Sequence, residues 1–150
     1  MAKSKFYEKM KDAIIERQVE DVYNEGINLY FPTDKGIEYP FACDGFVDTK
    51  TDNGKVLKLI IEYKFNEIMT NSVARAKVLV QVVYYIKRFE QNGMVLPNVC
   101  MVGDKDECFV MHTNELLSSD LCCICQTDGT VSGKTRNCSG ADHAVSSYIV

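Results

Sequence analysis

Two apolar runs separated by a short polar turn constrain this 150-residue chain more than any other feature. The turn, Asp52-Asn53-Gly54, is among the strongest local signals for a β-hairpin, because these residues readily adopt the positive φ angles of tight turns. The run before the turn begins at Pro40 and reaches about Asp48, and the run after it spans Val56 to Lys64. We therefore predict a hairpin whose second strand is buried along most of its length.

Charged side chains gather where the second strand ends. Side chains alternate across a strand, so Glu62 and Lys64 lie on one face. Ile61 and Tyr63 lie on the other face. If Asp44 of the first strand lies across from Glu62, two carboxylates and one ammonium group share a site. That set suits a divalent cation and metal-assisted attack of water on a phosphodiester. The alternative interpretation is an exposed strand end with a simple ion pair.

Helical periodicity flanks the hairpin. We predict one helix from Lys5 to about Asn24, with Ser4 as its N-cap and Gly26 as its stop. A second helix is predicted from Ser72 to Gln91, ended by Asn92-Gly93. Two further strands are predicted at Val99–Val102 and Cys108–His112. The resulting order, α-β-β-α-β-β, predicts an α/β layer architecture.

An Asp on one strand followed by Glu-x-Lys on the next resembles the signature of the PD-(D/E)xK nuclease superfamily. Here the signature falls on Asp44 and on Glu62-Tyr63-Lys64. Pro40 precedes Asp44 by four positions instead of standing beside it, so Asp48 is an alternative to Asp44. The competing triplet Asp48-Thr49-Lys50 is predicted to lie in a polar segment running into the turn.

Gln81 and Tyr85 match the Gln-x-x-x-Tyr helix motif of the RecB-like branch, and the motif follows the Glu-x-Lys strand as it does there. The resemblance spans roughly positions 5 to 112. It implies a restriction-endonuclease-like core, with a central mixed sheet flanked by helices. It also implies that Gln81 and Tyr85 orient the catalytic site.

The same resemblance assigns the remaining chemistry. Asp44 and Glu62 would hold Mg²⁺ or Mn²⁺, while Lys64 would position or activate the attacking water and neutralise charge on the phosphate. The family usually adds a carboxylate from the first helix. We expect Glu20 to supply it, with Glu16 as the alternative, because both lie on the shoulder of that helix's apolar face. A solvated acidic helix edge is the competing interpretation.

Positive charge gathers on the second helix although the chain carries a net charge of −4, which is unfavourable for a nucleic-acid binder. Lys77, Gln81, Tyr85 and Arg88 follow one another at steps of four, four and three and share a face. We expect Lys77, Arg88 and Arg75 to contact DNA phosphates. An amphipathic helix with a polar outer face is the alternative.

The C-terminal part of the chain changes in composition. We assign residues 1–117 to the nuclease-like domain and 118–150 to an extension rich in Cys, Ser and Gly. Within it, Cys122, Cys125, Cys138 and His143 imitate a zinc site, but their spacing favours packing over metal binding. The seven cysteines are expected to be reduced thiols in a cytoplasmic protein, since no apolar run approaches a membrane span.

The predicted function is a metal-dependent DNA endo- or exonuclease, in restriction or DNA processing. The expected partners are DNA and either a second copy of the chain or the rest of a larger restriction–modification polypeptide. A non-catalytic module of the same fold, binding nucleic acid or a partner protein, is the first alternative. A zinc-stabilised interaction module is the second.

Overall fold

The hairpin forms the first half of a mixed sheet in the structure, a computed structural model that describes residues 5–31, 33 and 35–118. The elements, in chain order, are α1 (Lys5–Asp12), α2 (Glu16–Tyr30), the 3₁₀ helix η1 (Pro40–Ala42), β1 (Gly45–Lys50), β2 (Val56–Tyr63), α3 (Ser72–Gln91), β3 (Val99–Gly103), β4 (Cys108–His112) and α4 (Thr113–Ser118). The prediction that Cys122, Cys125, Cys138 and His143 do not bind a metal concerns residues outside the described part of the chain.

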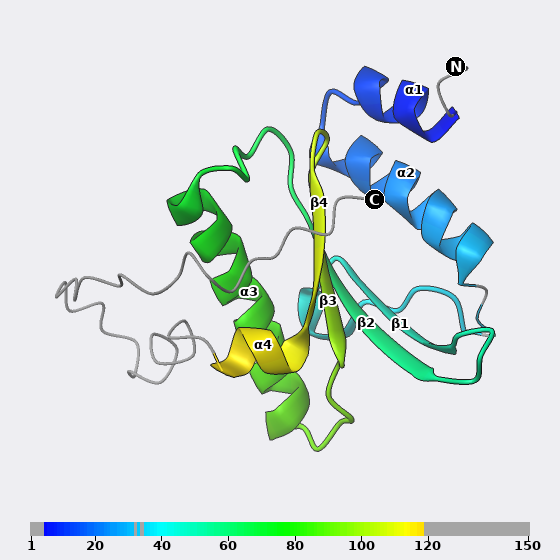
Figure 1. The fold of residues 1–150 in the computed structure, drawn as a ribbon, viewed down its shortest axis with the longest axis vertical. Coiled ribbons are helices and arrows are strands. Elements are labelled where there is room, and N and C mark those ends of the chain that lie inside the picture. Colours follow the sequence, from blue (N-terminus) through cyan, green and yellow to red (C-terminus); the bar gives the residue numbers. More distant parts are fainter. Residues whose placement is uncertain (1–4, 32, 34, 119–150) are drawn as a thin grey trace, which may run out of the picture.

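The strands pair in the order β1-β2-β3-β4 (Figure 1). β1 and β2 are antiparallel, with Gly45 opposite Ile61, and β3 and β4 are also antiparallel. β2 and β3 are parallel, with Glu62 opposite Val102, and α3 is the crossover that such a pair requires. The predicted α/β class, with a mixed sheet flanked by helices, is therefore confirmed.

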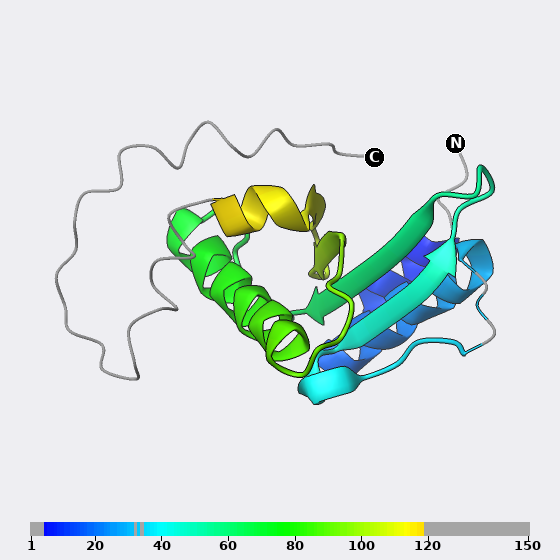
Figure 2. The ribbon, with the colours of Figure 1, turned by 90° about the horizontal axis from the view of Figure 1, so that it is seen from below.

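Each face of the sheet packs against its own helices, and Figures 1 and 2 show α1 and α2 on one side and α3 and α4 on the other. Phe46, Ile60, Cys100 and Val102 share a core with α3 and with Leu116 of α4. Val47, Leu59, Ile61 and Tyr63 share another core with Ile27 of α2. Because neighbours along a strand alternate between these cores, Glu62 belongs to the α3 side.

The prediction of one N-terminal helix ending at Gly26 is wrong. The chain breaks after α1 and restarts at Glu16, with Ile15 in an extended conformation as the N-cap of α2. The Lys105 ammonium donates a hydrogen bond to the carbonyl of Ala13 in the break, 2.7 Å away. Helix α2 continues through Gly26 because the following residue, Ile27, is buried against the sheet.

Local signals correctly identified the hairpin and the central helix. Gly54 has the positive φ angle, 78°, that its turn requires, and the chain reverses between Thr51 and Lys55. Helix α3 begins and ends where predicted. It begins after Asn71, because the Asn71 side chain accepts hydrogen bonds from the first amides of the helix. The triplet Asp48-Thr49-Lys50 forms the end of β1, so the first strand continues beyond Asp48, where its end was predicted.

Gly103, at the end of β3, packs directly beneath an aromatic ring, and its replacement by alanine is expected to destabilise the fold. An added Cβ would lie 2.8 Å from Cε2 of Tyr23. That ring stacks on Tyr63 and donates a hydrogen bond to the carbonyl of Asp104, so it has little room to move. We expect a loss of about 1–3 kcal/mol in the free energy of unfolding, measured by chemical denaturation.

Gly26→Ala provides the control for this prediction. Its added Cβ would meet only ordinary contacts with Phe6, 3.8 Å away, and alanine favours a helix interior. We expect this variant to be neutral or stabilised by up to about 1 kcal/mol. Equal destabilisation of the two variants would contradict the steric explanation.

Candidate active site

The hairpin register brings Asp44 beside Glu62. Asp44 directly precedes β1, whose first residue, Gly45, pairs with Ile61 on β2. Its Oδ2 accepts a hydrogen bond from the backbone N–H of Tyr63, at 2.7 Å, which ties the carboxylate to the neighbouring strand. Asp48, the alternative, instead lies opposite Lys58 and forms an ion pair with it. The structure therefore brings Asp44, and not Asp48, to the Glu-x-Lys triplet.

The chain approaches Asp44 through a constrained bend. Phe41 and Ala42 both have positive φ angles, 58° and 64°, which residues with a side chain rarely adopt. The Phe41 ring packs edge-on against Phe89 of α3, with ring centroids 5.3 Å apart, and holds the bend in place. This local strain leads the chain into the β1 register that carries the carboxylate.

Glu62 is only 1% exposed, and among the described residues it is the carboxylate with a buried oxygen that lacks a hydrogen-bond partner. Its Oε1 accepts a hydrogen bond from the Lys64 ammonium, whereas its buried Oε2 has no hydrogen-bond partner. Desolvation raises the pKa of this carboxyl to about 7; the hydrogen bond from Lys64 opposes the shift, and the Asp44 carboxylate adds to it. A buried oxygen without a partner is costly and calls for a proton or a cation.

Lys64 forms hydrogen bonds with both β2 and β3, the two strands that end at this site. Its ammonium donates to Glu62 and to the carbonyl of Tyr63, at 2.9 Å for the latter. Its backbone N–H donates to the carbonyl of Gly103 on β3, also at 2.9 Å. Desolvation lowers the pKa of Lys64, but the hydrogen bond and the charge of Glu62 outweigh it, so the pKa is raised overall. Lys64 is therefore an ammonium ion at neutral pH.

The acidic residues of α2 lie near Asp44, Glu62 and Lys64 but do not form a metal-binding group with them. Glu20 is part-buried and paired with Arg17. Desolvation raises the pKa of Glu20, Arg17 opposes this shift, and the charge of Asp44 contributes to it. Within residues 5–31, 33 and 35–118, no three Asp, Glu, His or Cys side chains form a group that could hold a metal ion. The roles of Glu20 and of exposed Glu16 as ligands stay predictions.

The Gln-x-x-x-Tyr pair of α3 faces the carboxylates. Tyr85 is 8% exposed, and the Gln81 side-chain amide donates a hydrogen bond to its hydroxyl oxygen at 3.5 Å. Desolvation raises the pKa of Tyr85, Gln81 opposes the shift, and the charges of Glu62 and Asp44 add to it. Both motifs that the sequence singled out therefore lie within electrostatic reach of one another.

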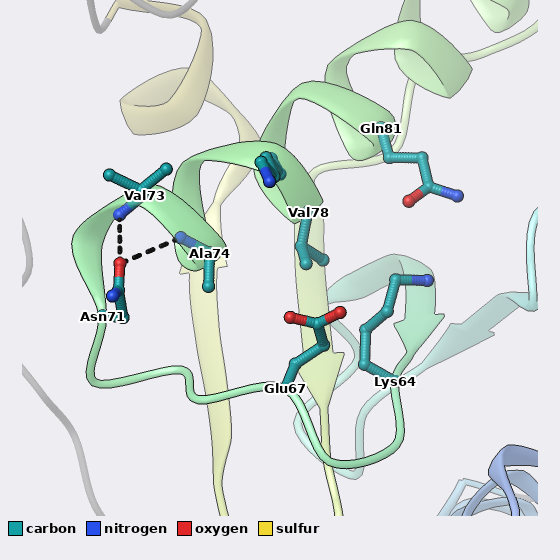
Figure 3. A pocket seen from close by; sticks show the side chains of 8 residues that line it. Lys64, Glu67, Asn71, Val73, Ala74, Val78 and Gln81 are labelled. Carbon is teal, nitrogen blue, oxygen red and sulfur yellow. Dashed lines mark hydrogen bonds between the residues drawn. The ribbon is translucent and has the colours of Figure 1, made fainter.

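A hollow of about 320 Å³ opens beside Lys64, between the β2–α3 connection and the first turns of α3. Figure 3 shows the Lys64 and Glu67 side chains rising into it, with Val78 and Gln81 on the helix above. Lys77 also lines this hollow. Glu67 was not predicted from the sequence, although its position three residues after Lys64 places it in the same connection.

Asp104, a second residue that was not predicted, holds the β2–α3 connection by a hydrogen bond. Asp104 follows β3 and is only 1% exposed. Its carboxylate accepts hydrogen bonds from the backbone N–H groups of Glu67, at 3.1 Å, and of Asp106, at 3.3 Å. Desolvation raises the pKa of Asp104, while these backbone hydrogen bonds oppose the shift. Asp104 was not among the site residues predicted from the sequence.

The three predicted DNA contacts differ in their availability. Lys77 is exposed at the hollow, whereas Arg75 donates from Nε to the carbonyl of Met69 at 2.9 Å and lies 5.7 Å from the Phe109 ring centre. Arg88 is exposed but lies 5.6 Å from the Phe41 ring centre. Arg75 is thus engaged within the fold, and Lys77 has the clearest approach to a ligand.

Comparison of the chain with protein-family models, with curated proteins and with solved structures finds no match. No described helix combines the length and apolar composition that a membrane crossing requires. The function must therefore be inferred from the geometry of Asp44, Glu62, Lys64 and the hollow beside them.

Proposed function

We propose that residues 5–118 form a metal-dependent nuclease domain of the restriction-endonuclease-like fold that hydrolyses phosphodiester bonds in DNA. The observation that carries this proposal is the buried Oε2 of Glu62, which lacks a hydrogen-bond partner beside a second carboxylate and a lysine. Burial of these charged groups lowers the stability of the fold, and such clusters concentrate at functional sites.

The donor atoms fit Mg²⁺ or Mn²⁺. Both ions prefer hard carboxylate oxygens, and Mg²⁺ in particular is commonly held by one or two carboxylates, with water and substrate phosphate completing its shell. Asp44 and Glu62 would hold the ion, and Glu20 of α2, whose carboxylate lies within electrostatic reach of Asp44, would assist. When bound, such an ion polarises the phosphodiester and neutralises part of its charge.

Lys64 would act as a charged hydrogen-bond donor. Its raised pKa keeps the proton on the ammonium at neutral pH, so it is suited to orient the attacking water and to stabilise negative charge that grows on the phosphate. Its hydrogen bonds to Glu62 and to the Tyr63 carbonyl hold it in position before substrate binds.

The hollow beside Lys64 would receive the phosphate. Lys77 supplies a second positive charge there, and Gln81 supplies an amide that already contacts Tyr85. Phosphate oxygens accept hydrogen bonds from both kinds of group, so these side chains are suited to position the backbone of the nucleic acid.

The 150-residue chain is expected to cleave DNA with Mg²⁺ or Mn²⁺ and to lose this activity in EDTA. Incubation of the purified protein with single- and double-stranded DNA under each condition checks the prediction, and Glu62→Gln serves as the matched negative control. If the wild type binds DNA but cleaves neither substrate with either ion, the domain is a non-catalytic binding module.

A further inference from the structure

A second hollow, of about 580 Å³, lies at the turn end of the hairpin, away from Asp44 and Glu62. β1 contributes Asp48, Thr49 and Lys50, and β2 contributes Lys58. Lys35, from the segment after α2, also borders it. The triplet Asp48-Thr49-Lys50, which imitates a catalytic motif in the sequence, thus takes part in a separate surface.

Positive charge predominates in this hollow, although the whole chain is acidic. Three lysines line it against one carboxylate. Lys58 forms an ion pair with Asp48, and Lys35 lies 3.7 Å from Glu38. Lys50 is exposed, and among the described residues no carboxylate lies within ion-pair distance of it. The surface is therefore ready to attract an anion.

The strand register relates this surface to the candidate active site. Residues paired across two strands share a face, so Asp48 and Lys58 lie on one side of the sheet together with Phe46 and Ile60. Glu62 continues the same alternating series on β2. Glu62 lies four positions after Lys58 on β2, a distance of about 13 Å, which corresponds to about four nucleotides along one strand of B-form DNA.

We propose that Lys35, Lys50 and Lys58, hereafter the hairpin lysines, bind the phosphate backbone of nucleic acid a few nucleotides away from the bond that is cleaved. This inference depends on the proposed nuclease function for the identity of the polyanion. Asp48 has the opposite effect: it holds Lys58 in place but weakens the attraction for phosphate, because its carboxylate adds a negative charge to the hollow.

Charge-changing variants with opposite expected signs test this surface. Lys50→Ala and Lys35→Ala are each expected to weaken DNA binding by about two- to fivefold at low salt and to reduce the salt slope of log K by about 0.9 or less. Asp48→Asn is expected to strengthen binding by a similar factor. Lys11→Ala, on exposed α1 across the sheet, removes the same charge and is expected to leave affinity unchanged.

Binding is measured by fluorescence anisotropy of short labelled single-stranded and duplex DNA, in Ca²⁺ and over a salt series, so that it does not depend on cleavage. Cleavage is measured separately in Mg²⁺. Unchanged affinity in the Lys35, Lys50 and Asp48 variants, with cleavage by the wild type intact, overturns the hairpin inference alone. Affinity changes of the expected signs in a protein that cleaves nothing support the surface and overturn the nuclease function.

Two further outcomes complete the test. If Lys11→Ala weakens binding as much as Lys50→Ala, the effect is one of total charge and the hairpin inference is wrong. Vesicles containing phosphatidylserine form a parallel arm. If the hairpin variants change vesicle binding but not DNA binding, the surface recognises an anionic membrane and the proposal is also overturned.

Discussion

Lys64→Ala is expected to remove DNA cleavage while it leaves the fold and most of the DNA affinity intact. One ammonium among several cations adds little to the ground-state affinity for phosphate. At the cleaved bond it would act where charge grows in the transition state, and the loss of such a group typically lowers the rate by about 10²–10³-fold. Single-turnover cleavage in Mg²⁺, measured beside DNA binding in Ca²⁺, checks both halves of the prediction.

Lys77→Ala is the matched control, since it removes an equal charge from the same hollow. We expect it to weaken binding and flatten the salt dependence, with a smaller effect on the chemical step. Arg88→Ala is expected to behave in the same direction, moderated by its contact with the Phe41 ring. If Lys64→Ala and Lys77→Ala lower the rate only in proportion to affinity, Lys64 has no catalytic role.

The buried Glu62 carboxyl is expected to make the metal-free protein more stable in mild acid than in mild base. Its pKa rises from 4.5 to about 7 on folding, so the folded state binds the proton more tightly than the unfolded state does. The stabilisation is fully present below pH 4.5, decreases as the pH rises, and is lost above about pH 7. A shift of this size corresponds to about 3 kcal/mol.

Chemical denaturation in EDTA at pH 4 and at pH 8, for the wild type and for Glu62→Gln, measures this contribution. The difference between the two proteins isolates Glu62 from other groups with raised pKa values, such as Asp104. We expect the wild type to lose about 3 kcal/mol relative to the variant between these pH values. Mg²⁺ should restore stability to the wild type at pH 8, because a ligand that binds only the folded state stabilises it. A pH-independent difference would contradict the burial of an ionisable Glu62.

Elements whose cause is local were predictable from the sequence. The Asp52-Asn53-Gly54 turn and the Asn71 cap of α3 depend on residues next to the elements that they define. The same holds for the Glu62–Lys64 pair, since alternation along a strand needs no knowledge of the rest of the fold. Asp44 was less certain, because the choice between it and Asp48 depends on the cross-strand register.

Features whose cause is distant were missed. The break between α1 and α2 is held by Lys105, 92 residues away, and nothing near Ala13 signals it. The backbone N–H of Glu67 donates a hydrogen bond to the carboxylate of Asp104, which lies in another loop 37 residues away. Helix α4 follows β4 directly, and its Leu116 is buried in the core around α3. These contacts exist only once the parallel pair β2–β3 has formed.

The hairpin register has a consequence for the order of folding events. The contact of Asp44 with the Tyr63 amide spans only 19 residues, whereas the walls that exclude water from Glu62 come from α3 and β3. Hairpins form in about 1–10 μs, and pairing between distant strands is slower. We therefore expect the two carboxylates to meet while they are still hydrated, and Glu62 to lose its water only when the crossover helix α3 docks. The cost of burying the ionised carboxyl is then absent from the transition state for folding and present only in the native state. Raising the pH is therefore expected to increase the unfolding rate and to leave the folding rate almost unchanged.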